Sequence, residues 1–215
     1  MSRPARPLAA PTATRLTAAA ADAFARNGLD GASLNGILKQ AQMGKGSFYH
    51  HFADKAALHD WVTEALSQTL VAQVRPPQLS TLTTATFWPE LSELLDRLGR
   101  TAATQPELMD LGRMFHNSTY IPPERRIAKV RHAMIAWLTD ALRLGQTLGI
   151  IRRDLPLGLL TAWTIASLTA IDHWALTATT SVTERRTAAD TALNSLWQIL
   201  TTTGQTAGQA PPPTS

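Results

Sequence analysis

Residues 34–52, LNGILKQAQMGKGSFYHHF, restrict the fold of this chain more than any other stretch. Its apolar residues recur at helical spacing and continue after a short turn: Leu34, Ile37, Leu38, Ala41, Met43, Phe48 and Phe52. Side chains that can hydrogen-bond lie between the later ones: Lys45, Ser47, Tyr49 and His50. Gly44 and Gly46 leave that side thin enough for backbone to approach phosphate. The stretch therefore predicts a helix-turn-helix, whose second helix packs by one side and touches DNA by the other.

A specific pattern extends to both sides of this stretch. Its positions are Leu16, Ala20, Phe24, Asn27-Gly28, Ser33, Ile37, Ala41, Met43, Lys45-Gly46, Phe48-Tyr49, His51-Phe52, Lys55 and Leu58. On these positions, residues 15–60 resemble, without a gap, the DNA-binding domain of the tetracycline-repressor (TetR) family of bacterial transcription regulators. The resemblance implies an all-α protein, in which an amino-terminal three-helix DNA-binding domain precedes a helical ligand-binding and dimerisation domain.

Four positions depart from the family's usual residues. The family usually has an acidic residue at Gly36, alanine at Leu38, glycine at Gln42, and serine or threonine at Gly44. Glycine inside a short helix should cost roughly 1 kcal/mol relative to alanine. Gln42 places a Cβ in a turn that favours glycine, and Gly44 removes a side chain that could cap the helix.

Seven residues are predicted to contact DNA: Ser33, Gly44, Lys45, Ser47, Tyr49, His50 and Lys55. The resemblance implies phosphate contacts for Tyr49 and Lys55. A lysine in the first turn of a helix opposes the helix dipole, which makes sense if Lys55 faces a phosphate. Ser33 is expected to cap its helix, and its hydroxyl could also meet a phosphate. Tyr49 could instead only cover the edge of the core, whereas Lys45 and Ser47 are expected to read bases.

The remaining chain predicts further helices, about nine in all. They are expected from Thr12 or Thr14 to Arg26, from Ser33, over 44–52, from Asp54 to before Pro76, from Trp88, from Pro106, and over about 124–148, 157–177 and 183–202. The expected domains are a flexible arm (1–12), the DNA-binding domain (13–60), the helical body (61–203) and a disordered tail (204–215). Arg3 and Arg6 in the arm could reach DNA or simply be solvated. The basic run ERRIAKVR at 124–131 is expected to be a solvated face, with a second nucleic-acid surface as the alternative.

Aromatic residues in the body suggest a small-molecule pocket. The candidates are Trp88, Phe115, His116, Trp137, Trp163 and His173, a mixture of apolar walls with few polar groups that suits a small hydrophobic ligand. Plain core packing is the alternative for each aromatic. The two apolar carboxy-terminal helices suggest a homodimer joined as a four-helix bundle, with Trp174, Leu193, Leu196 and Trp197 at the interface.

Composition and missing motifs limit the other possibilities. The chain has 215 residues, no cysteine and no apolar run near 18 residues, so we expect no disulfide, no transmembrane helix and a cytoplasmic location. Residues 1–60 hold seven Lys/Arg against four Asp/Glu, a basic balance that suits DNA. Adjacent histidines on a helix point about 100° apart, so His50 and His51 predict no metal site.

No catalytic motif, metal or cofactor is expected, since nucleotide-binding loops, G-x-S-x-G, H-E-x-x-H and paired Glu-x-x-His motifs are all missing. The expected partners are a pseudo-palindromic double-stranded DNA operator, a second copy of the chain and a small hydrophobic ligand, and the expected function is a repressor that this ligand releases. A helical-bundle enzyme and a ligand-independent helix-turn-helix activator are the alternatives.

Overall fold

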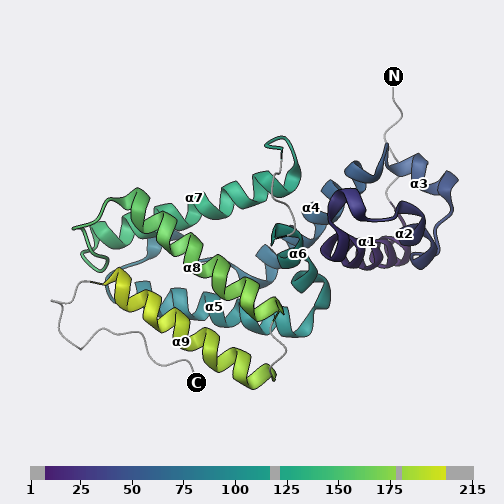
Figure 1. The fold of residues 1–215 in the computed structure, drawn as a ribbon. Helices are drawn as coiled ribbons and strands as arrows, with labels where there is room; N and C mark the ends of the chain where they lie inside the picture. The colour runs from purple at the N-terminus through teal and green to yellow at the C-terminus, as the bar shows by residue number, and fades with distance from the viewer. Residues whose placement is uncertain (1–7, 117–121, 178–180, 202–215) are drawn as a thin grey trace. The chain divides into compact units, whose positions relative to one another are not determined.

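A computed structural model describes residues 8–116, 122–177 and 181–201, and all regular structure in these ranges is helical (Figure 1). The elements are α1 (Ala10–Gly31), α2 (Leu34–Gln40), α3 (Lys45–His51), α4 (Lys55–Val74), the 3-10 helix η1 (Leu79–Thr81), α5 (Phe87–Thr104), α6 (Pro106–His116), α7 (Arg126–Thr147), α8 (Leu157–Thr177) and α9 (Val182–Leu200). The all-α prediction is confirmed. The chain forms two compact units, Met1–Gln73 with Thr101–Arg131, and Val74–Arg100 with His132–Ser215, which we call the first and second unit.

The first helix begins earlier than the sequence suggested. It starts at Ala10, with Pro11 in its first turn, where the missing N–H of proline breaks no intrahelical bond. Residues 10–12 are therefore helical and not part of an arm, whereas Arg3 and Arg6 lie outside the described residues. Gly28 interrupts α1 with φ 66° and ψ −179°, which confirms that the long part of the helix ends at Asn27-Gly28. A single further turn, residues 29–31, precedes α2.

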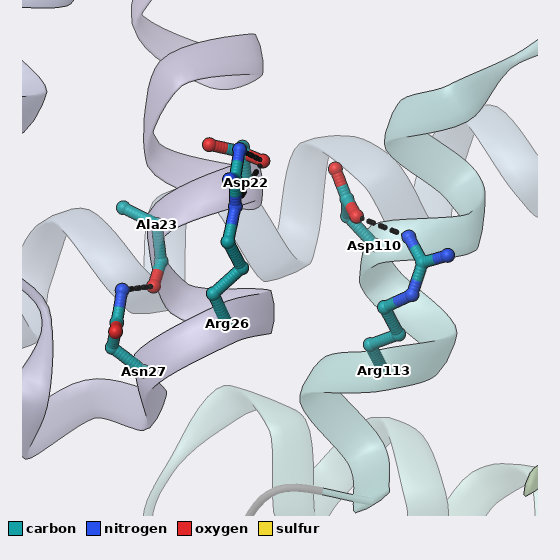
Figure 2. Close-up of polar contacts among 6 residues, drawn as sticks. All are labelled: Asp22, Ala23, Arg26, Asn27, Asp110 and Arg113. Atoms are coloured by element: carbon teal, nitrogen blue, oxygen red, sulfur yellow. Dashed lines mark hydrogen bonds and ion pairs between the residues drawn. The ribbon is translucent and has the colours of Figure 1, made fainter. Parts of the chain in front are cut away.

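The core of the first unit joins the amino-terminal helices to distant parts of the chain. Buried residues of α1, α2, α3 and α4 pack with Leu108, Leu111 and Met114 of α6 and with Ile127 of α7. Helix α6 makes its most extensive contact with α1. Figure 2 shows two ion pairs beside each other on these helices, one between Asp22 and Arg26 of α1 and one between Asp110 and Arg113 of α6, the latter at 2.8 Å. Asp22, and more weakly Asp110, raise the pKa of the Arg26 guanidinium, so the α1–α6 contact is charge-complementary at its rim.

The second unit has its own core, built from α5, α7, α8 and α9. Its buried residues are Leu82, Phe87, Trp88, Leu91, Leu142, Ile150, Ile151, Leu160, Leu196 and Leu200. The Trp88 ring meets the Phe87 ring edge-on at 5.0 Å and the Trp197 ring at 4.8 Å. A Cβ on Gly145 would lie 2.5 Å from the Ile151 side chain, so this close approach of α7 to residues 150–151 requires glycine.

This core corrects two of the predicted interface residues. Leu196 is only 3% exposed and Trp197 is partly buried against Trp88, so both pack inside their own chain. Sequence spacing identified an apolar stripe on α9 correctly, but it could not distinguish a stripe that faces its own core from one that faces a second copy.

Helix α8 has large apolar residues on its exposed side as well as on its buried side. Leu160 is fully buried, while Leu159, Trp163 and Trp174 are 42%, 46% and 40% exposed. Ala166 and Ala170 are also exposed, and their spacing places them on the same face as Leu159, Trp163 and Trp174. Within the described residues, nothing covers this outward apolar face of α8.

Candidate nucleic-acid interface

The turn between α2 and α3 is shaped by a residue that is not glycine. Gln42 has φ 54°, a left-handed conformation that L side chains adopt rarely. The Met43 N–H donates to the Leu38 carbonyl at 2.9 Å, which closes the turn. Ala41 and Met43 on either side are buried in the core of the first unit. The turn is therefore held by packing of its neighbours, and Gln42 itself points into solvent.

The ends of the two short helices match the expectations from sequence. The Ser33 hydroxyl accepts a hydrogen bond from the Gly36 N–H at 3.2 Å, which confirms its role as the N-cap of α2. Gly44 occupies the N-cap position of α3 with no side-chain hydrogen bond. No other atom lies within 4 Å of the Cβ that a side chain would add at Gly44 or Gly46. The amino-terminal end of α3 is therefore open to an incoming ligand on this side.

Helix α3 has one buried and one exposed side. Phe48 is completely buried, with its ring stacked on Phe52 at 5.3 Å, and Phe52 in turn meets Trp61 of α4 at 5.4 Å. The exposed side holds the residues predicted to meet DNA, which are Lys45, Ser47, Tyr49 and His50. The Tyr49 side chain is 60% exposed and only its inner edge touches Phe48, at 5.1 Å between ring centroids. This exposure leaves room for a polar contact, and the ring contact with Phe48 is also one that a residue at the edge of the core would make.

Lys55 has partners that sequence reasoning missed. Its ammonium donates to the carbonyls of Asp30 and Ala32, both at 2.9 Å. These carbonyls lie at the end of α1 and just before α2, and this contact explains the lysine at the start of α4 without an anion. The carboxylate of Asp54 accepts from the Ala57 N–H at 2.7 Å and caps the helix. An ammonium has three protons, so a phosphate contact remains open to Lys55 as a third bond.

Arg15 is a residue that the sequence pattern did not identify. Its Nε donates to the Ala41 carbonyl at 3.2 Å, so it ties α1 to the carboxy-terminal end of α2. Arg15 and Ala41 are 26 positions apart, and only the crossing of the two helices brings them together. No periodicity or motif marks such a contact in advance.

His59 is a buried imidazole on α4 whose Nδ1 has no hydrogen-bond partner in the described residues. Its ring meets Phe24 of α1 edge-on at 4.9 Å. Burial of the ring, and to a lesser extent the charge of Arg125, lower the pKa of His59 to about 4, against the opposing effect of Asp60. The side chain is therefore neutral at pH 7, and it belongs to the core that supports the interface.

Both units contain residues predicted to line a ligand pocket. Phe115 packs partly against the core of the first unit, whereas Trp88 is buried and Trp137 partly buried in the second. Trp163 and His173 are exposed on α8, and the side chain of His116 lies outside the described residues.

Two surface hollows are formed by other residues. One, of about 580 Å³, is lined by Arg143, Gln146, Thr147, Arg153, Leu155, Pro156 and Leu157, and the other, of about 320 Å³, by Pro77, Gln78, Thr81, Leu82, Thr86 and Glu90. Neither includes a predicted pocket residue. Within the described ranges, no cluster of histidine and acidic side chains could hold a metal ion. No helix there is long and apolar enough to cross a membrane.

Comparison with known proteins bears directly on this arrangement. Residues 16–60 match the family model described as "Bacterial regulatory proteins, tetR family". Over 69 residues the chain is 36% identical to the HTH-type transcriptional regulator UidR of Escherichia coli K12, and the match covers 32% of this chain and 35% of that regulator. The chain thus spans only about a third of the length of the curated relatives it matches.

Solved structures resemble a larger part of the chain. A TetR family transcriptional regulator from Chloroflexus aurantiacus gives a TM-score of 0.71 at 20% identity and covers 91% of this chain and 95% of its own. SmeT, described as the repressor of the Stenotrophomonas maltophilia multidrug efflux pump SmeDEF, gives 0.65 at 18% identity over 94% and 96%. FadR from Bacillus subtilis, in complex with stearoyl-CoA, gives 0.66 at 16% identity over 86% and 97%. At these identities the likeness shows a shared fold.

The fold and the two-sided α3 define a helix-turn-helix protein of the DNA-binding class. Residues 16–60 match the DNA-binding part of the tetR family of bacterial regulatory proteins, and the chain shares its fold with a solved TetR family regulator.

Proposed function

We propose that the protein is a homodimeric, sequence-specific DNA-binding regulator of transcription, and that it acts as a repressor released by a small hydrophobic ligand. The observation that carries the proposal is the division of α3 into a buried side, anchored by Phe48, and an exposed side with Lys45, Ser47 and Tyr49. A helix that enters the major groove must pack against the protein core on one side and present hydrogen-bonding groups to DNA on the other.

The exposed groups divide into two roles on DNA. Lys45 and Ser47 lie at the open amino-terminal end of α3 and are proposed to contact base edges. Tyr49, Ser33 and the third proton of Lys55 are proposed to contact phosphates and fix the helix in the groove. His50 and the backbone of Gly44 complete the surface. In this division, two side chains determine which DNA sequence is preferred, and the others contribute affinity for any DNA sequence.

A second copy of the chain is the proposed partner of α8. Its outward face carries a tryptophan near each end, Trp163 and Trp174, with Ala166 and Ala170 between them. Small residues allow the backbones of two helices to approach, and the tryptophans then bury large apolar surfaces. Leu193 of α9, which is partly buried, remains a candidate for the same interface. A symmetric dimer would present two copies of α3 to two half-sites.

The ligand is the part of the proposal that rests most on relatives. FadR is described in complex with stearoyl-CoA and SmeT as a repressor of a multidrug efflux pump, and both share this fold. In this chain the apolar core around Trp88 and Trp137 is the proposed receiving region. A ligand there would have to displace a buried ring. It would therefore bind more tightly to a conformation in which the ring has already moved than to the packed conformation.

Selection of genomic DNA fragments by the purified protein tests the proposal. We expect an enriched inverted repeat, because a symmetric dimer reads two copies of one half-site, with centres about 34 Å or a multiple of it apart. Binding should weaken steeply with added salt, as Lys and Arg contacts release counterions from the phosphates. Selection that yields no repeat, together with binding insensitive to salt, would contradict the proposal.

A further inference from the structure

Helix α7 begins with a charge arrangement that is unfavourable for an isolated helix. Arg125 precedes it, Arg126 is its first residue, and no acidic residue occurs in its first turn. The first N–H groups of a helix have no intrahelical acceptor, and the positive end of the helix dipole repels cations. The start of α7 therefore needs acceptors and negative charge from elsewhere.

Helix α4 supplies both, from Asp60 and Glu64, which are spaced one turn apart. The Asp60 carboxylate accepts from the Arg126 backbone N–H at 3.0 Å and lies 3.2 Å from the Arg125 guanidinium. The Arg126 side chain pairs with Glu64 at 2.6 Å. Asp60 thus serves as the N-cap of a helix to which it does not belong, and the basic run at 124–131 is partly a paired surface.

Two further contacts fix the same place. The Arg125 guanidinium donates to the Ala56 carbonyl at 2.7 Å, and Ile127 is buried in the core of the first unit. We call the set of Arg125 and Arg126 with Ala56, Asp60 and Glu64 the α7 clamp. All five residues belong to the first unit.

The α7 clamp contacts α4 close to the point where α4 itself contacts the DNA-binding helices. Ala56 follows Lys55, whose ammonium holds the Asp30 and Ala32 carbonyls. Lys55 and Ala56 are adjacent at the start of α4. Lys55 contacts the end of α1, and Ala56 contacts Arg125 at the start of α7.

We propose that the α7 clamp is a positioning device, which sets the first turns of α4 and thereby the presentation of α3 to DNA. This inference rests on the proposed DNA-binding function. Residues 125 and 126 touch no DNA in this assignment. They act through α4, so their loss should weaken specific binding while leaving the base preference unchanged.

A charge-exchange series at Glu64 and Arg126 tests the clamp. Glu64→Arg and Arg126→Glu each place like charges together, and the double variant restores an opposite pair at the original net charge. Both single variants should bind the duplex selected by the wild type about 2- to 30-fold more weakly, because the effect cannot exceed the interaction energy of a cap or ion pair. The double variant should recover most of the affinity.

The sign of the Glu64→Arg effect separates positioning from simple electrostatics. This change adds positive charge, which by itself would strengthen binding to DNA. Lys129→Glu is the matched control for Arg126→Glu, since Lys129 is exposed one turn further along α7 and the change in charge is the same. Lys129→Glu should weaken binding less than Arg126→Glu does. Circular dichroism should show the same helix content in every variant.

Amide hydrogen exchange in the free protein supplies a measurement that needs no DNA. Residues 55–64 should exchange faster in both single variants than in the wild type, and return to slow exchange in the double variant. Unchanged exchange in the single variants, tighter binding by Glu64→Arg, or a double variant as weak as the single ones would each overturn the clamp. A wild-type protein that selects no duplex would overturn the proposed function, and the exchange comparison would still decide whether the clamp exists.

Discussion

His59 should make the folded protein sensitive to mild acid. Its pKa falls from an ordinary 6.5 to about 4 because the ring is buried and lies near Arg125. Between these values the unfolded chain binds a proton that the folded one does not, so stability is complete above pH 6.5 and decreases as the pH falls toward 4. At about 1.4 kcal/mol per pH unit, the loss reaches about 3 kcal/mol.

Denaturant unfolding of wild type and His59→Leu, each measured at pH 7 and pH 4.5, checks this prediction. The variant should lose less free energy of unfolding over that interval, since leucine does not titrate. Equal losses in the two proteins would assign the acid sensitivity to other groups.

Gln42 holds a conformation that glycine would adopt more easily. Gln42→Gly should raise the free energy of unfolding by roughly 0.5–1 kcal/mol, the left-handed penalty less the added backbone entropy of glycine. Gln40→Gly is the matched control. Gln40 is the last residue of α2 and has a helical conformation, so glycine at this position should lower the stability of the protein. Thermal unfolding in which both variants lose stability would show that the Gln42 side chain makes a favourable contact.

Local rules predicted the residues whose roles depend on their immediate neighbours. Ser33 as a cap, Gly28 as a break and the strain at Gln42 all follow from backbone preferences within a few residues. Lys55 was predicted to oppose the helix dipole, and it does, but its partners are 23 and 25 residues away. Sequence alone could identify a lysine at the unfavourable end of a helix dipole. Only the packing of α1 against α4 shows that the Asp30 and Ala32 carbonyls stabilise its charge.

At the scale of the element, α3 should separate stability from recognition. Phe48→Ala removes a fully buried ring and should cost roughly 3–5 kcal/mol, so the first unit should unfold and specific binding should disappear with it. Tyr49→Phe should leave the unfolding curve unchanged and weaken binding to all duplexes alike, because it removes the proposed phosphate contact. Lys45→Ala or Ser47→Ala should instead change the selected sequence, at roughly 1–3 kcal/mol for a base contact. Selection experiments in parallel with unfolding curves measure all four, and a changed base preference in Tyr49→Phe would be inconsistent with its assigned role.

The helix positions were largely predictable, while their faces were not. Helices α5, α6, α7, α8 and α9 begin and end within about two residues of the positions expected from Pro, Gly and capping residues, wherever sequence defined an end. An apolar stripe shows that a helix face is buried, without showing against what. Leu196 and Trp197 therefore appeared suited to an interface but lie in their own core, and Trp88 appeared suited to a pocket but is packed against Phe87 and Trp197.

At the scale of the whole molecule, α8 and α9 should respond differently to an added charge. Trp163→Glu alters an exposed position and should yield folded monomers, which lose most affinity for an inverted repeat because only one half-site is engaged. Leu196→Glu places a carboxylate in the core of the second unit and should unfold that unit instead. Sedimentation and circular dichroism distinguish the two results. A dimer that persists in Trp163→Glu would move the interface away from α8.

The tryptophans provide the measurement for ligand control. A hydrophobic compound that enters the second unit should change the fluorescence of Trp88 or Trp137 in a saturable way and release the selected duplex over the same concentration range. Linkage requires that DNA weakens binding of the compound by the same factor by which the compound weakens binding of DNA. The corresponding coupling free energy is typically about 1–3 kcal/mol. Equal affinity of the compound for free and DNA-bound protein would exclude control through that site.

The core of the first unit also has a consequence for how the protein is made. The family match ends at residue 60, yet the same core is completed by Leu108, Leu111, Met114 and Ile127. A ribosome that adds roughly 5–20 residues per second reaches those positions several seconds after the DNA-binding helices have been synthesised. During that interval the part of α1 that packs against α6 has no cover, and the nascent segment is exposed to chaperones and to other unfinished chains. A fragment that ends at residue 60 should therefore associate or remain partly unfolded, even though it contains every residue assigned to DNA.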